Sequence, residues 1–157
     1  MLKPKELAKW GVLVVSIMVC DQLSKWLVTK HLLLHEPKAI MPGLNFMLAY
    51  NQGAAFGFLA ESSGWQRWLF VGLAVVISLG VFFWLKSLTS KDKLESFALV
   101  CILGGALGNL IDRVRLGVVI DFIDVYVKDW HWYTFNLADS AICVGAVLLM
   151  CVSCFKK

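Results

Sequence analysis

Four stretches of this chain are apolar and long enough to cross a lipid bilayer, and they restrict the fold more than any other feature. They cover approximately residues 10–28, 65–85, 94–112 and 135–155. A helix rises 1.5 Å per residue, so about 20 apolar residues cross a hydrocarbon core of roughly 30 Å. The sequence therefore predicts an all-α integral membrane protein built as a bundle of four transmembrane helices.

Composition supports one membrane unit. Of the 157 residues, 59% are hydrophobic and only 17% are charged, which is outside the range of an ordinary soluble domain. Four spans with short connections leave no room for a separate soluble domain, so we expect residues 1–157 to form a single domain. The net charge of +4 comes from Lys and Arg in short flanks beside the apolar stretches. This pattern argues against nucleic acid as a partner and points to membrane orientation.

The first nine residues contain three lysines and precede an apolar run from Trp10, which together resemble a secretory signal. No small-residue cleavage site follows, and the helical pattern continues to Val28. We therefore expect this segment to be retained as the first span.

Four spans place both termini on one side of the membrane. The flanks on that side are much denser in Lys and Arg than the two long loops on the other side, residues 29–64 and 113–134. The positive-inside rule then predicts cytoplasmic termini and periplasmic loops.

The first long loop is broken by proline and glycine, and its segment Leu44 to Tyr50 has the character of a strand. We expect a small β-like subdomain there. The following segment, Tyr50 to Gly57, combines an amide with small residues. It predicts either a close backbone approach to a ligand or a plain turn, and the residues alone favour neither.

The acidic residues are concentrated in and beside the predicted spans, where a charged group costs free energy. Carboxylates lie at or beyond the outer ends of the third and fourth spans and in the outer part of the first: Asp112, Asp121, Asp124, Asp129, Asp139 and Asp21. An ionisable group in or beside a span is expensive and marks a functional candidate. Two carboxyl groups brought together cannot both ionise comfortably, so one keeps a proton while the other acts as a base towards water. This chemistry is that of an aspartic peptidase, although composition does not separate Asp121 from Asp124.

Two spacings predict helix contacts. Asp21 and Lys25 stand in the favoured i, i+4 order of a helical ion pair, although a long lysine near a helix end can also extend to the membrane surface. Gly104 and Gly108 allow a close helix approach. Gly105, Asn109 and Asp112 share one face of the same helix.

Other chemistries fit less well. The chain has no His-Glu-x-x-His zinc motif and no Gly-x-Ser-x-Gly elbow. His31 and His35 would share a face if their segment were helical, and His131 lies in the other loop. These histidines make a metal site conceivable, but exposed loop positions explain them better. The five cysteines lie in apolar runs, where reduced cysteine behaves as a small hydrophobe.

Two other functional classes of membrane protein also remain possible from the residues alone. A small transporter or proton pathway also uses carboxylates within spans, but such a protein places its key charges near the bilayer midplane. A non-catalytic scaffold with buried polar pairs would tolerate amides at the aspartate positions.

Five motifs resemble, in order and spacing, those of the bacterial signal peptidase II family. They are Asp21-Gln22-Leu23-Ser24-Lys25, Asn51-Gln52-Gly53-Ala54-Ala55-Phe56, Gly108-Asn109-Leu110-Ile111-Asp112-Arg113, Val119-Ile120-Asp121-Phe122 and Phe135-Asn136-Leu137-Ala138-Asp139-Ser140. The resemblance covers nearly the whole chain. It implies an aspartic endopeptidase of the inner membrane that removes the signal peptide from diacylglyceryl-modified prolipoproteins, cutting just before the lipidated cysteine.

The resemblance also implies roles for individual residues. Asp121 and Asp139 would form the catalytic dyad. A supporting polar shell would comprise Asp21, Asn51, Gly53, Asn109, Asp112, Arg113, Asn136 and Ala138. The family needs no metal or organic cofactor, its members contact membrane lipids, and the antibiotic globomycin would be expected to occupy the site.

Overall fold

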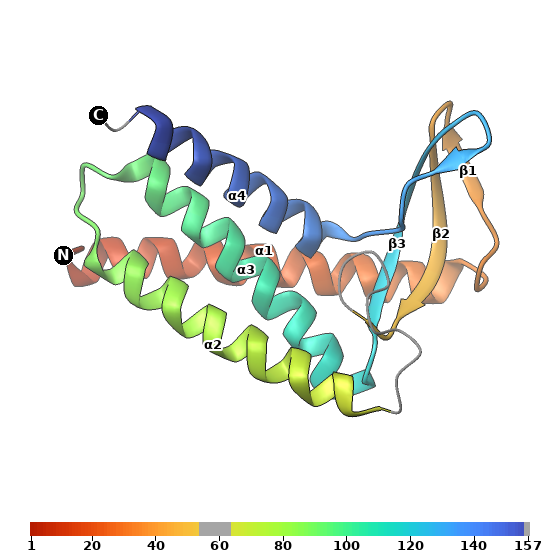
Figure 1. Ribbon diagram of the computed structural model, residues 1–157, viewed down its shortest axis with the longest axis horizontal. Coiled ribbons are helices and arrows are strands. Elements are labelled where there is room, and N and C mark those ends of the chain that lie inside the picture. The colour runs from red at the N-terminus through yellow and green to blue at the C-terminus, as the bar shows by residue number, and fades with distance from the viewer. Residues whose placement is uncertain (54–63, 156–157) are drawn as a thin grey trace.

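The computed structural model describes residues 1–53 and 64–155, in which four long helices run side by side and a small antiparallel sheet covers one end of them (Figure 1). The helices are α1 (Pro4–His31), α2 (Trp65–Ser87), α3 (Lys93–Leu116) and α4 (Leu137–Phe155). Each is long and apolar enough to cross a membrane. The start of α1 and the end of α4 both lie at the end of the helices away from the sheet.

All four helices have bounds that differ from the predicted spans, and α2 differs only at its end, Ser87 instead of residue 85. α1 begins six residues earlier than the predicted residue 10, with Pro4 in its first turn, and α3 continues past residue 112 to Leu116. Hydropathy marks only the apolar part of a helix, whereas Lys and Arg are good helix formers and extend it at both ends. α3 stops where Gly117 takes a left-handed conformation with φ of 80° and its N–H bonds the Arg113 carbonyl. α4 starts at Leu137, two residues later than predicted.

The sheet contains four described strands in the order β1 (Lys38–Met41), β2 (Leu44–Asn51), β3 (Val119–Val127) and β4 (Trp130–His131). The predicted strand from Leu44 is therefore confirmed. β2 and β3 pair with Asn45 opposite Asp124 and Ala49 opposite Asp121, and β2 has one extra residue between these pairs. One face of the pair buries Leu48, Ile120 and Phe122 against Val28 of α1.

α3 is the central helix, and glycines bring its neighbours close. The predicted close approach is confirmed, because a Cβ on Gly104 would lie 2.9 Å from Ile17 of α1 and one on Gly108 would lie 2.6 Å from the Asp21 carboxylate. At Gly105 the neighbour that comes close is the backbone of α4. A Cβ there would overlap the Ala138 carbonyl oxygen. Small residues are what allow helices to pack this closely in a membrane.

An ion cluster is buried between α1 and α3. The Lys25 ammonium lies 2.8 Å from Asp21 Oδ2 and 2.8 Å from Asp112 Oδ2, and it donates to Asn109 Oδ1 at 2.9 Å. All three charged side chains are at most 3% exposed. The ion pair of Asp21 and Lys25 is thus confirmed, but Lys25 does not extend to the surface. Three acceptors already match its three N–H donors, so leaving the interior would strand two carboxylates.

The two aspartates of the cluster also accept hydrogen bonds from the backbones of α4 and β3. Asp21 Oδ1 accepts the backbone N–H of Ala138 in α4 at 3.0 Å, and Asp112 Oδ2 accepts the N–H of Ile120 in β3 at 3.3 Å. Gln22 adds a 2.8 Å bond to Asp112 Oδ1. One buried cation therefore organises α1, α3, the start of α4 and the start of β3.

Replacing Gly105 with alanine should separate α3 from α4. The added methyl group meets the Ala138 backbone and Ile142, so we expect Gly105→Ala to destabilise the fold by about 1–3 kcal/mol, the usual cost of overpacking. Gly80→Ala in α2 is the matched control, because a Cβ there has nothing within 4 Å. Thermal unfolding in detergent measures both, and equal melting temperatures would contradict the close contact.

Replacing Lys25 with methionine should be more damaging. The change leaves the Asp21 and Asp112 carboxylates buried without their cation, which costs about 3–5 kcal/mol when one partner of a buried pair is removed. Lys30→Met serves as the control, since Lys30 lies exposed in the last turn of the same helix. The same unfolding experiment compares them, and a Lys25→Met protein as stable as Lys30→Met would refute the role of the cluster.

Candidate active site

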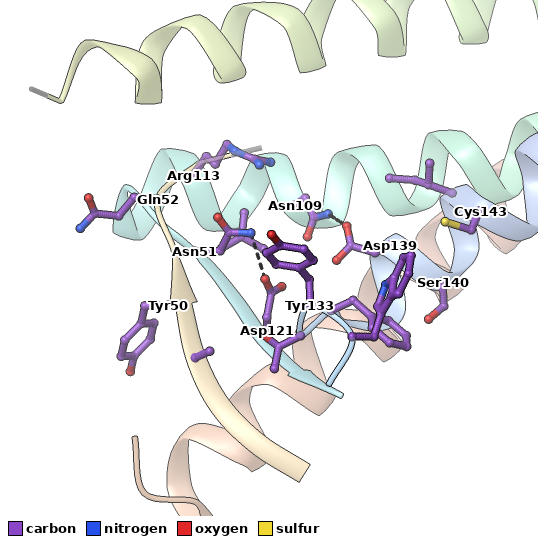
Figure 2. Close-up of a pocket in the computed structure, with 16 residues that line it drawn as sticks. Tyr50, Asn51, Gln52, Asn109, Arg113, Asp121, Tyr133, Asp139, Ser140 and Cys143 are labelled. Carbon is purple, nitrogen blue, oxygen red and sulfur yellow. Dashed lines mark hydrogen bonds between the residues drawn. The ribbon is translucent and has the colours of Figure 1, made fainter. Parts of the chain in front are cut away.

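A cavity of about 800 Å³ opens where the sheet meets the ends of α3 and α4, and both Asp121 and Asp139 line it (Figure 2). Asp121 comes from β3 and Asp139 from the first turn of α4. The two residues are 18 positions apart in the sequence. Because both reach one cavity, a molecule bound there would meet two carboxyl groups at once.

Asp121 is 2% exposed and is held by two amides. Asn136 Nδ2 donates to its Oδ1 at 2.7 Å, and Asn51 Nδ2 donates to its Oδ2 at 3.1 Å. Burial and the nearby Asp139 carboxyl raise the pKa of Asp121 to about 7, against the opposing effect of the two amide donors. Its carboxyl group can therefore hold or release a proton near neutral pH.

Asp139 is fixed by the way α4 begins. Asn136 is the residue before the helix, and its Oδ1 accepts the Asp139 N–H at 2.9 Å, while Asp139 Oδ2 accepts the Asn136 N–H at 3.2 Å. This reciprocal pair is an Asn-x-x-Asp form of the capping box, which satisfies N–H groups that a helix start leaves free. The same Asn136 side chain also holds Asp121, so one cap orders both carboxyl groups.

Asn109 connects the cavity to the buried ion cluster. Its Nδ2 donates to Asp139 Oδ1 at 2.8 Å, and its Oδ1 accepts the Lys25 ammonium at 2.9 Å. A lysine ammonium can only donate, so the oxygen of Asn109 must face Lys25 and its NH₂ must face Asp139. The cluster thereby fixes which end of the amide meets the carboxylate.

Arg113 and Asn51 form the other side of the cavity. Arg113 Nη2 donates to the Gly53 carbonyl at 3.1 Å, and the Gly53 N–H donates to Asn51 Oδ1 at 2.9 Å. This turn directs the NH₂ of Asn51 towards Asp121. A turn at Asn51 and Gly53 is therefore observed, whereas the rest of that motif, Ala54 to Phe56, lies outside the described residues.

The structure separates Asp124 from Asp121. Asp124 bonds Asn45 and His131 and does not line the cavity, and Asp129 lies exposed in the turn after β3. The hydroxyl group of Ser140, which also lines the cavity, donates to the Asn136 carbonyl at 2.9 Å. No histidine accompanies it in the cavity among the described lining residues.

The histidines do not share a helix face. α1 ends at His31, and His35 lies beyond it with φ of 60°, so the condition for that pairing is not met. In residues 1–53 and 64–155 no group of three His, Cys, Asp or Glu side chains is arranged to hold a metal ion. All five cysteines are free thiols.

Some residues of the site were not assigned from the sequence. Lys25 and Gln22 belong to one of the five motifs but carry no predicted role in the site, although both hold Asp112. Trp132 and Tyr133 line the cavity and are separated from the Phe135-Asn136 motif only by Thr134. Two aromatic residues next to a functional motif are the signal that could have pointed to them.

A water molecule between a protonated and an ionised carboxyl group is what acid–base hydrolysis of a peptide bond requires. The cavity brings two carboxyl groups together, Asp121 almost fully buried and Asp139 partly buried. Its wall is otherwise mainly apolar and aromatic, including Val119, Phe135 and Ile142. The arrangement can therefore bind an extended, largely apolar peptide segment across two carboxyl groups.

Comparisons with known proteins show the family to which the chain belongs. The family model for signal peptidase (SPase) II matches residues 13–155. A lipoprotein signal peptidase of Polynucleobacter necessarius subsp. necessarius is 45% identical over 149 residues, covering 95% of this chain and 91% of that protein. The Coxiella burnetii lipoprotein signal peptidase is 48% identical over 148 residues, with coverage of 94% and 91%.

Two solved structures have the same fold. A bacterial membrane enzyme determined in meso at 2.3 Å matches with a TM-score of 0.82 and 26% identity, over 92% of this chain and 87% of that one. Another, at 1.9 Å, matches with a TM-score of 0.81 and 25% identity, over 96% and 94%. Together with the matched family model, these likenesses show that the chain is a peptidase belonging to the signal peptidase II family.

Proposed function

We propose that this protein removes the signal peptide from diacylglyceryl-modified prolipoproteins, cutting just before the lipidated cysteine as an aspartic endopeptidase. The substrate class follows from the relatives, which are lipoprotein signal peptidases. The observation that carries the mechanism is the pair of carboxyl groups, Asp121 and Asp139, in one cavity at the end of four apolar helices.

In this mechanism the two carboxyl groups share one proton. The ionised member removes a proton from a water molecule, which attacks the carbonyl carbon of the scissile peptide bond, while the protonated member donates to the carbonyl oxygen. The tetrahedral intermediate then breaks its C–N bond as the nitrogen takes a proton from the pair. A pKa of about 7 for Asp121 supports this division, because one proton stays on the pair near neutral pH.

The supporting residues orient these groups. Asn136, Asn109 and Asn51 donate to the carboxyl oxygens, which leaves the remaining acceptor capacity for water and substrate. Arg113 lines the cavity and can donate to a peptide carbonyl. Asp21 and Asp112 act at a distance through the backbone N–H groups of Ala138 and Ile120, and Gly53 keeps the Asn51 turn close to Arg113.

The proposed location is the bacterial inner membrane, with four spans, cytoplasmic termini and a periplasmic site. Supporting it, the sheet and the cavity lie at one end of the helices, and the termini lie at the other (Figure 1). The basic flanks around the termini and the α2–α3 connection fit the cytoplasmic side. Lipid chains would cover the outer faces of the helices, and globomycin would compete with substrate for the cavity.

A transporter is the weaker alternative. The relatives do not support it, and Asp121 in β3 and Asp139 in the first turn of α4 lie at one end of the helices rather than at their middle, where transport sites are expected.

Changing either cavity aspartate to asparagine should abolish processing. Asp121→Asn and Asp139→Asn each remove one partner of the shared proton, and we expect the cleavage rate of a lipid-modified prolipoprotein to fall by about 10²-fold or more. Asp129→Asn is the control, because this exposed aspartate lies outside the cavity. Electrophoresis of substrate incubated with purified protein measures the rate, and processing that survives either cavity change would end the dyad mechanism.

The rate should fall on both sides of a pH optimum. As pH rises through about 7, the raised pKa of Asp121, the pair loses its shared proton and can no longer protonate the carbonyl oxygen. At low pH the pair takes up a second proton and the base is lost. Single-turnover rates against pH test this, and a rate that stays constant well above pH 7 would contradict a shared proton.

A further inference from the structure

The sheet contains a second buried carboxylate, and the dyad mechanism does not use it. Asp124 in β3 is 1% exposed. Asn45 Nδ2 of β2 donates to its Oδ2 at 2.8 Å, and His131 Nδ1 of β4 lies 2.8 Å from its Oδ1 and 3.0 Å from its Oδ2. Opposite a carboxylate, Nδ1 of the ring is the protonated nitrogen. Asp124 therefore joins three neighbouring strands through side chains.

His131 is held from a second side by Tyr126. The two rings stack with centroids 5.2 Å apart and an interplanar angle of 18°. Asp124 and Tyr126 are titratable groups in contact with the imidazole, and Asn45 adds a neutral amide that bonds the same carboxylate. The ring thus has both its orientation and its hydrogen bond fixed, although about half of the side chain is exposed.

The segment directly after His131 forms a wall of the cavity. Residues 132–135 all line it. Both ends of this wall are bonded to β3. The Trp132 N–H donates to the Val125 carbonyl at 2.8 Å, and Phe135 donates to Ile123 and accepts from Phe122 and Ile123, while β4 pairs with β3 at two positions. Beside the Trp132 end, β4 has a ladder of only two pairs, so a side-chain bond there adds to what holds that end of the wall. The Asp124–His131 bond anchors the end of the wall that is nearest to β4.

We propose that His131, through its hydrogen bond to Asp124, is a positioning residue. It holds the wall 132–135 at the distance from the opposite side of the cavity that a bound peptide requires. This inference rests on the proposed peptidase function and deepens it. The bond fixes where substrate binds and leaves the carboxyl groups of the dyad in place, because these are held independently by Asn51, Asn109 and Asn136. Loss of the bond should therefore weaken substrate binding more than it slows the chemical step.

Two substitutions separate the hydrogen bond from the ring. His131→Phe keeps a ring to stack on Tyr126 but has no donor for Asp124, and His131→Asn keeps a donor near the Nδ1 position but has no ring. We expect His131→Phe to raise KM about tenfold, the effect of losing one hydrogen bond to a charged group, with kcat within about threefold of the wild-type value. His131→Asn should restore KM to near the wild-type value.

A third arm tests whether His131 acts through Asp124. If it does, adding His131→Phe to Asp124→Asn should change KM no further than Asp124→Asn alone, since the acceptor is already altered. Should Asp124→Asn not fold, amide hydrogen exchange of the His131→Phe protein replaces this arm. Exchange should then rise in residues 125–135 and stay unchanged in α3 and α4.

The outcomes distinguish this inference from the proposed function. A wild-type protein that leaves lipid-modified prolipoprotein uncut contradicts the function itself. Processing by the wild type together with an unchanged KM in His131→Phe overturns the positioning role, as does a fall in kcat at constant KM. Failure of His131→Asn to restore KM would also overturn it, because the donor would then not be what matters.

Discussion

The buried Lys25 ammonium is the interaction on which the arrangement of this molecule depends. A buried ion pair is weak evidence for stability in itself, because desolvation offsets most of the attraction, but removing one partner is costly. In this protein the ion cluster matters because it fixes the orientation of the polar groups around it. Asp21 and Asp112 turn their second contacts towards the backbones of Ala138 and Ile120, next to the two catalytic candidates, and Asn109 turns its NH₂ towards Asp139. One cation in the interior thereby fixes groups on four elements.

The two carboxyl groups can share one cavity because most of the groups that contact their oxygens are hydrogen-bond donors. Asp121 accepts two amide bonds and Asp139 accepts an amide and a backbone bond, and each of these contacts favours the charged form. For Asp121, burial and the neighbouring carboxyl outweigh the two amide donors, which is why its pKa is raised to about 7. A dyad needs this balance, since fully compensated carboxylates would hold no proton and uncompensated ones would never be ionised.

The four helices and the glycine contacts could be predicted because hydropathy and small-residue spacing are properties of short segments. Composition and periodicity could not separate Asp121 from Asp124, since they predict only a loop for residues 113–134, and only the family resemblance favoured Asp121. Once β3 is a strand, residues three apart point to opposite faces, and one aspartate meets Asn51 while the other meets Asn45. The burial of Lys25 could not be predicted for a similar reason: one helix alone allows both the ion pair with Asp21 and extension to the surface, and only the approach of α3 supplies Asp112 as a second partner.

The cap at Asn136 also explains why the cavity lies at one end of the helices. A helix leaves N–H groups unpaired only in its first turn, so a carboxylate held by a capping box must stand at a helix start. In a transmembrane helix that position is the rim of the hydrocarbon core. A peptidase built on such a cap can act only on a bond near the membrane surface, and the proposed substrate presents its bond there, where a signal helix ends at a lipid-bearing cysteine. The scissile bond of the proposed substrate and a cap at the N-terminus of a transmembrane helix therefore lie at the same depth in the membrane, close to its surface.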